Sequence, residues 1–314
     1  MQKKIILGLA SLLVVAFLGA DRAEAATVYI IGGANNNTPA LNDVWQTTDM
    51  VNWTNSTAPF TPRYTHAGVV YMGNLAIVGG STPGQSIHND IWRSINGMTW
   101  LQLLPTTNLP AIWEHAMANF AGKMWILSGS LSSGLTNQIR TSTNGTVWAN
   151  EPNAPWTARL GHTATVFNNK LYIIGGSASD GVQTKDVWSL SSEMVWHKDV
   201  ENIQAASRTR HTTIVFKKKL WVLGGASTLG LGFLNDVWST SDGATWTQQA
   251  IAPWSARLNL GSVVLNGKLY IMGGTDAYGT VKNDIWSTTD GTTWIEETAN
   301  APWPERTDFV VLKK

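Results

Sequence analysis

The chain has 314 residues, a net charge of +1, no cysteine and 17 tryptophans. The balanced charge argues against nucleic acid or an anionic membrane surface as the main partner, because both attract clustered basic charge. The absence of cysteine excludes disulfide bonds, thiolate catalysis and cysteine-ligated metal sites, so an exported form depends on its core for stability.

The first 25 residues have the pattern of a secretory signal peptide. Lys3 and Lys4 give a basic start, residues 5–20 are apolar, and Ala23-Glu24-Ala25 is a small-x-small cleavage site. The apolar run is short for a membrane span, which needs roughly 20 residues. We expect cleavage after Ala25 and secretion to the periplasm or the medium, without membrane insertion of the mature chain. Residues 26–314 then form one domain, which we expect to be monomeric.

Six apolar stretches of the mature chain each end in a pair of small residues. Five pairs are Gly-Gly, and the third is Ser128-Gly129. Successive pairs are 47 or 49 residues apart; their second members are Gly33, Gly80, Gly129, Gly176, Gly225 and Gly274. A fixed spacing of this size predicts a propeller with one blade per repeat.

Residues 257–304 show the expected repeat in full. Its four predicted strands are residues 260–265, 269–274, 283–288 and 293–296, with tight turns at Asn266-Gly267 and Asp290-Gly291. Asn-Gly suits the positive φ angles of a two-residue hairpin turn. No amphipathic helical period follows residue 26, so the predicted class is all-β.

Eleven tryptophans recur at fixed places in the repeat. The third strand carries an Asn-Asp-x-Trp pattern in most copies, and the fourth strand carries a second tryptophan. These residues are Trp45, Trp92, Trp188, Trp238 and Trp286, and Trp53, Trp100, Trp148, Trp196, Trp246 and Trp294. Their regular spacing predicts packing between twisted blades, where large flat side chains fill the diverging space.

The Gly-Gly steps, the Asn-Asp-x-Trp strands and the spaced tryptophans together resemble the kelch repeat, over essentially the whole mature chain. The resemblance implies a six-bladed kelch-type β-propeller of four-stranded antiparallel blades. The mature chain begins with a second-type strand, so residues 306–312 are expected to pair beside residues 27–56 in a composite blade. This pairing would close the ring and remove its exposed sheet edges.

A recurring arginine stands in the loop that enters each blade except the third, which has Ile112. These arginines are Arg63, Arg159, Arg208, Arg257 and Arg306. Five such side chains would make the channel mouth electropositive and suit a carboxylate or phosphate, which the arginine fork binds well. The alternative is that each arginine fixes its own loop by bonding carbonyl groups and acidic side chains.

Aromatic residues stand close to these arginine positions, namely Trp113, Trp156, Trp254 and Trp303. Aromatic faces beside arginine donors suit sugar rings, which makes these residues candidates for ligand binding. The alternative is that they cover the apolar ends of the blades.

Four histidines follow the arginine position by three residues: His66, His115, His162 and His211. Equivalent positions on neighbouring blades are roughly 10 Å apart. Nitrogens that share one zinc ion lie within about 4 Å of each other. We therefore expect no metal and no cofactor, and a buried hydrogen bond for each histidine.

The third repeat departs most from the pattern, with Ser128 in its glycine pair and Gln138 in place of the usual aspartate. Its Glu114 is the one candidate catalytic residue, as a general acid or base beside neighbouring arginines. The alternative is structural drift, with Glu114 compensated by Arg140 or an adjacent arginine.

The loops between second and third strands are short and rich in small polar residues, which favours a shallow recognition face. We therefore expect an exported binding module for a glycan, peptide or protein at the channel mouth. One alternative is a sugar-isomerising enzyme, because exported sialic-acid mutarotases are similar six-bladed kelch propellers. Another is a structural protein of the envelope or an extracellular layer. A glycosidase needs two placed carboxylates, and only Glu305 or Asp308 could accompany Glu114.

Overall fold

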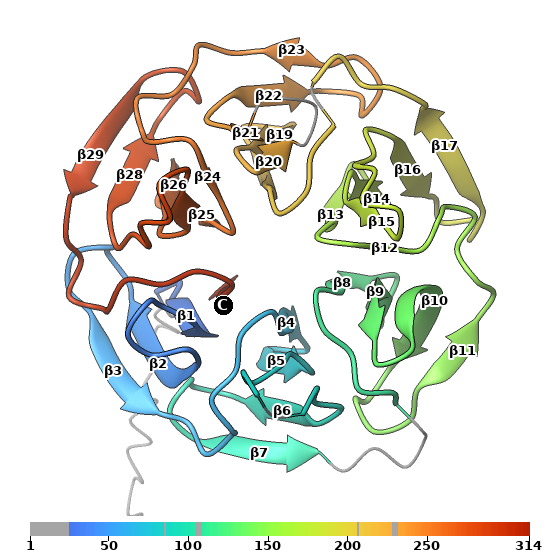
Figure 1. Cartoon of the computed structure of the whole chain (residues 1–314), viewed down its shortest axis with the longest axis horizontal. Coiled ribbons are helices and arrows are strands. Elements are labelled where there is room, and N and C mark those ends of the chain that lie inside the picture. Colours follow the sequence, from blue (N-terminus) through green and yellow to red (C-terminus); the bar gives the residue numbers. More distant parts are fainter. Residues whose placement is uncertain (1–24, 85, 104–108, 206, 228–231) are drawn as a thin grey trace, which may run out of the picture.

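The computed structural model describes residues 25–84, 86–103, 109–205, 207–227 and 232–314. The predicted signal peptide, apart from Ala25, lies outside these residues. Six four-stranded antiparallel sheets stand as blades around a central channel (Figure 1). The predicted six-bladed, all-β propeller is confirmed. Within the described ranges, no helix is long and apolar enough to cross a membrane.

Blade 1 joins the two ends of the chain. From the channel outward it contains β30 (Val310–Lys313), β1 (Val28–Gly33), β2 (Leu41–Thr47) and β3 (Thr54–Thr57). Val28 pairs with Lys313 and Ile31 with Val310, so β30 is the innermost strand. Beyond this ladder, Thr27 and Lys314 exchange two backbone hydrogen bonds of 2.7 and 2.9 Å. The predicted composite blade is confirmed, and the C-terminus lies beside β1 in Figure 1.

The other five blades follow in chain order, each with its first strand at the channel. Blade 2 contains β4 (Ala67–Tyr71), β5 (Asn74–Val78), β6 (Ile91–Ser94) and β7 (Trp100–Leu103). Blade 3 contains β8 (Ala116–Phe120), β9 (Lys123–Leu131), β10 (Gly134–Ser142) and β11 (Ala149–Glu151). Blade 4 contains β13 (Thr163–Phe167), β14 (Lys170–Ile174), β16 (Val187–Leu190) and β17 (Trp196–Val200).

The last two blades have the same order of strands. Blade 5 contains β18 (Thr212–Phe216), β19 (Lys219–Leu223), β22 (Val237–Thr240) and β23 (Thr247–Gln248). Blade 6 contains β25 (Gly261–Leu265), β26 (Lys268–Met272), β28 (Ile285–Thr288) and β29 (Trp294–Thr298). Short two-stranded ribbons tie the loops together: β12 (Arg159–Leu160) with β15 (Ser177–Ala178), β20 (Ala226–Ser227) with β21 (Gly232–Phe233), and β24 (Arg257–Leu258) with β27 (Thr275–Asp276).

The hydrophobic core is divided among the six interfaces between adjacent blades. Each interface has its own cluster of buried side chains, and each cluster includes one fourth-strand tryptophan. Between blades 1 and 2, for example, Trp100 and Leu75 pack with Tyr29 and Val44. The predicted packing role of these tryptophans is confirmed.

The Gly-Gly step makes room for the first strands of two blades. In blade 2, a Cβ atom on Gly79 would lie 2.3 Å from the carbonyl oxygen of Ile112 in the next blade. A Cβ atom on Gly80 would lie 2.7 Å from the Cβ of His66 in its own blade. Both glycines have positive φ, +62° and +90°, which side chains disfavour. The pair therefore fixes the distance between neighbouring blades at the channel.

Candidate functional site

The five recurring arginines lie inside the blades, not on the channel mouth. Each is at most 1% exposed. Each donates two hydrogen bonds of 2.6–3.0 Å to the aspartate at the start of the third strand of its own blade. The pairs are Arg63–Asp90, Arg159–Asp186, Arg208–Asp236, Arg257–Asp284 and Arg306–Asp43. Each arginine also donates to the carbonyl of the first glycine in the pair.

These contacts correct the expectation of an electropositive arginine ring. A carboxylate already occupies each guanidinium fork, so the pairs are neutral and a ligand at the mouth meets none of them. The same aspartates accept the indole N–H of the third-strand tryptophan, as in Trp286 to Asp284 at 2.9 Å. In each of these blades the aspartate, the tryptophan two residues after it and the arginine of the entry loop thus form one hydrogen-bonded unit, which fixes the entry loop.

The aromatic candidates also lie in the interior. Trp156, Trp254 and Trp303 are 3% exposed or less. Trp254 packs edge-on against Trp294 with ring centroids 6.0 Å apart, and Trp303 packs similarly against Trp53. Trp113 is half-buried, and its backbone pairs with Ser130. Three of the four therefore cover the blade ends, and none of those three offers a free face to a sugar.

The departures of blade 3 compensate one another. Ile112 replaces the arginine and Gln138 replaces its aspartate, so both partners of the buried ion pair are absent together. Ser128, which replaces glycine, accepts a hydrogen bond of 2.8 Å from the indole of Trp156. Arg140 donates to Asn150 and Gln138 and does not pair with Glu114. Apart from Glu114, the unusual residues of this blade have structural roles.

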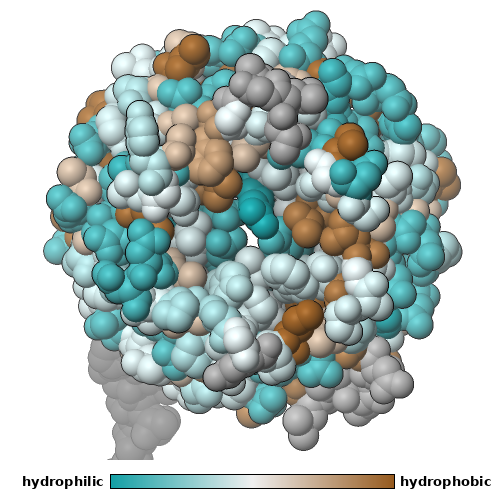
Figure 2. Space-filling model, in the orientation of Figure 1, coloured by the Kyte–Doolittle hydropathy of each residue, from teal (hydrophilic) through white to brown (hydrophobic). Residues whose placement is uncertain are grey.

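One residue from each blade forms a ring at the channel mouth, directly before the histidine position. This mouth ring consists of Thr65, Glu114, Gly161, Arg210, Asn259 and Asp308. All six have left-handed backbones, with φ between +48° and +63°. Five backbone N–H groups donate to the carbonyl of the ring residue in the preceding blade. The ring lines a cavity of about 200 Å³, and Figure 2 shows a hollow with hydrophilic surface at the centre of the molecule.

Glu114 and Arg210 form an ion pair across blade 4. The Arg210 Nη2 lies 2.6 Å from Glu114 Oε1, and its Nε lies 3.3 Å from Oε2. The Glu114 side chain is 5% exposed and that of Arg210 is 36% exposed. Between them stands Gly161, where a Cβ atom would lie 2.2 Å from Thr209 Oγ1 and 3.1 Å from Arg210 Cγ. The missing side chain at position 161 lets Arg210 reach Glu114.

Asp308 is the third charged group of the cavity. Desolvation at this site raises its pKa to about 6, with Glu114 adding to the increase and Arg210 opposing it. The side chain of Asn259 also favours the ionised form through a hydrogen bond. Asp308 is therefore a carboxyl group that changes charge near neutral pH.

The four histidines lie just below the mouth ring and are uncharged. His66, His115 and His162 are each 6% exposed, and desolvation lowers their pKa to about 3. The expected hydrogen bond is clearest for His211, whose Nε2 lies 3.3 Å from Thr163 Oγ1. Backbone groups of Ile31 and Leu127 lie close enough to favour the charged forms of His66 and His162, against the larger effect of burial. The ring nitrogens of His115 have no partner in the described part of the chain. Among the same residues, no group of three or more histidine or acidic side chains could hold a metal ion.

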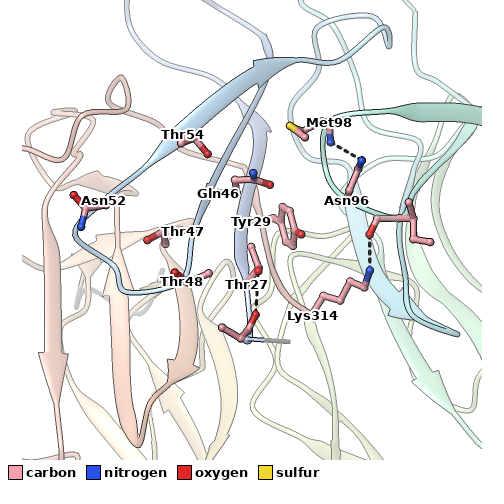
Figure 3. A pocket seen from close by; sticks show the side chains of 12 residues that line it. Thr27, Tyr29, Gln46, Thr47, Thr48, Asn52, Thr54, Asn96, Met98 and Lys314 are labelled. Carbon is pink, nitrogen blue, oxygen red and sulfur yellow. Dashed lines mark hydrogen bonds between the residues drawn. The ribbon is translucent and has the colours of Figure 1, made fainter. Parts of the chain in front are cut away.

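A larger cavity, of about 480 Å³, lies between blades 1 and 2 near the paired ends of the described chain (Figure 3). Its wall includes Tyr29, Gln46, Asn96, Met98 and Lys314. The Lys314 ammonium donates to the backbone carbonyl of Ile95. Among the described residues, this wall contains no acidic side chain. The mouth ring instead brings together two carboxylates and a guanidinium, and is the stronger candidate for recognition.

Sequence reasoning missed Arg210, Thr65 and Asn259 at the mouth, and named Asp308 only as a second carboxylate for a glycosidase. A signal was present, because the residue before the histidine position differs in every blade, whereas the histidine recurs in four blades and the arginine three positions before it recurs in five. Variation at one position of a regular repeat marks a place that the fold does not dictate.

Fold and repeat structure define this protein as a kelch-type propeller. Residues 140–310, more than half of the chain, match the family described as the KLHDC2/KLHL20/DRC7 Kelch-repeats domain. The chain belongs to this kelch-repeat family, whose propellers typically act as protein-binding modules. It is also similar to Tip elongation aberrant protein 1 of Schizosaccharomyces pombe, with 28% identity over 180 residues. The match covers 51% of this chain but only 15% of that protein.

Proposed function

We propose that this chain is an exported protein-binding module that holds a polypeptide partner at the mouth of its channel. One observation carries the proposal: six blades each contribute a different residue to the ring around a single polar cavity. The rest of the repeat is committed to packing and to the buried arginine–aspartate pairs. Protein binding is also the usual role of the family.

The six-residue mouth ring suits recognition for a physical reason. Its backbone is held by hydrogen bonds from blade to blade, so its side chains are presented from a rigid frame. A rigid frame lowers the entropy that binding costs. A cavity of this size admits one or two side chains of a partner, and the surrounding loops would contact the rest.

A display experiment tests the site without assuming a ligand. Random dodecapeptides on phage are selected on the wild-type protein, and the binders are measured on the variant Glu114→Gln/Arg210→Gln. We expect the variant to lose binding, because both substitutions remove a charge from the cavity while leaving a polar side chain at each position. Its melting temperature shows whether it remains folded.

The matched control is Lys217→Gln/Lys219→Gln, at the exposed hairpin end where β18 leads into β19, at the far end of the channel. This variant should bind every selected peptide as the wild type does. If selected peptides bind the mouth variant as tightly as the wild type, the mouth is not the binding site.

Export is the second part of the proposal and rests on residues 1–25. Expression with this leader should deliver a protein whose amino-terminal residue is Ala26, as read by amino-terminal sequencing of the secreted fraction. A full-length protein that stays in the cytoplasm would contradict it.

One observation favours a sugar-isomerising enzyme as a second candidate. Asp308, with its pKa near 6, shares the cavity with the carboxylate of the Glu114–Arg210 ion pair, so two carboxyl groups are placed for proton donation and acceptance. Anomer exchange of N-acetylneuraminate followed by NMR tests this activity. It should be accelerated by the wild type and lost in Asp308→Asn; no acceleration by the wild type removes this candidate.

A further inference from the structure

We propose that the group that enters the mouth cavity carries a positive charge, as a lysine side chain, an arginine side chain or a free amino terminus does. This inference rests on the proposed function and names the chemistry that the mouth selects. It reverses the expectation from the sequence, in which arginines made the mouth attractive to anions.

The balance of charge in the cavity is negative. Of its lining residues, Glu114 and Asp308 are acidic and Arg210 is basic. The four histidines that line it are neutral because burial holds their pKa far below 6.5. The five blade arginines contribute no net charge, because each is matched by an aspartate. The ionised cavity therefore carries one excess negative charge.

The excess charge lies on Asp308. Arg210 gives its closest contact, 2.6 Å, to Glu114, and within the described residues Asp308 has no ion pair. The site is thus a half-buried carboxylate that lines the cavity without an ion pair to any described residue, next to a guanidinium that is already paired. A cation that entered the cavity would complete the pairing, whereas an anion would meet two carboxylates. In a partly desolvated cavity, this difference is larger than it would be in open water.

Three capped tripeptides that differ only in charge test the inference: Ac-Gly-Lys-Gly-amide, Ac-Gly-Gln-Gly-amide and Ac-Gly-Glu-Gly-amide. Their dissociation constants are measured by ligand-observed NMR at pH 7.5. We expect the lysine probe to bind at least about tenfold more tightly than the glutamine probe, and the glutamate probe to bind most weakly, as expected for one unscreened charge in a partly buried site. Lys217→Gln/Lys219→Gln serves as the control and should keep this order.

The variant Asp308→Asn should abolish the preference for lysine, and so should lowering the pH to 5, where Asp308 takes up a proton. The histidines His66, His115 and His162, whose pKa is about 3, stay neutral at that pH. Equal affinities for the three probes, tighter binding of the glutamate probe, or no binding of the lysine probe would each overturn the inference. The phage selection makes no assumption about charge, so acidic peptides that depend on the mouth would uphold the proposed function and overturn only this inference.

Discussion

At the scale of single residues, burial decides which charged side chains a ligand can reach. The sequence places five arginines at equivalent loop positions, but it cannot show which way they point. Each finds its aspartate 27 or 28 residues later in the chain, or 263 residues away across the ring closure. That separation follows from the length of the blade and becomes clear only when the strands are paired. The sequence does contain one hint, since blade 3 lacks arginine and aspartate together.

The first prediction concerns this buried pair. Arg257→Ile should destabilise the protein by about 3–5 kcal/mol, because it leaves the charge of Asp284 buried without its cationic partner. The double variant Arg257→Ile/Asp284→Gln has the residues of blade 3 at these positions. Its loss of unfolding free energy should be clearly smaller than the sum of the losses in the two single variants. The free energy of unfolding in urea measures both. The exposed pair Lys268–Glu297 gives the control, since Lys268→Gln should cost less than about 1 kcal/mol. If Arg257→Ile were as stable as the wild type, the structural role of the buried arginine–aspartate pair would be contradicted.

A second residue-scale prediction follows from the raised pKa of Asp308. In the unfolded chain this carboxyl titrates near 3.8 and in the folded protein near 6, so the folded state holds the proton more tightly. The stability due to this group is complete below pH 3.8 and is lost as the pH rises through 6. Asp308→Asn should therefore raise the melting temperature at pH 8 and leave it nearly unchanged at pH 4. If Asp308→Asn changed the melting temperature more at pH 4 than at pH 8, the pKa of Asp308 would not be raised by folding.

At the scale of strands and blades, the repeat predicted the architecture well and the strand ends less well. The first strand of blade 6 was expected at 260–265 and is Gly261–Leu265. The third was expected at 283–288 but begins at Ile285. The reason is that Asn283 and Asp284 use their side chains to hold the entry loops instead of extending the ladder. Apolar alternation cannot reveal this competition between side-chain and backbone hydrogen bonds.

Ring closure gives the prediction at this scale. Deleting residues 306–314 removes β30, the partner of Asp43 and the innermost strand of blade 1. The edge of β1 and the apolar faces of two blades would then be exposed, so cooperative thermal unfolding should disappear. Circular dichroism during heating measures this. A truncated protein that melts cooperatively at the wild-type temperature would contradict the closed ring.

At the scale of the whole molecule, the propeller brings together residues that are remote in sequence. Glu114 and Arg210 are 96 residues apart in the chain, and Asp308 comes from its other end. Period and spacing predict that equivalent positions surround one channel, and that much could be deduced. Which of these positions face the cavity depends on the left-handed backbone of the mouth ring. The residue types do not predict this conformation, because five of the six members are not glycine.

Hydrogen–deuterium exchange with and without a peptide selected on the wild-type protein tests the central claim most directly. The backbone amides of the mouth ring take part in bonds between blades, so their exchange reports on this place. We predict that the bound peptide slows exchange in segments that contain Glu114, Arg210 and Asp308 and leaves the turn at Lys217–Lys219 unchanged. Protection confined to that turn or to the outer strands, with the mouth segments unaffected, would contradict the account.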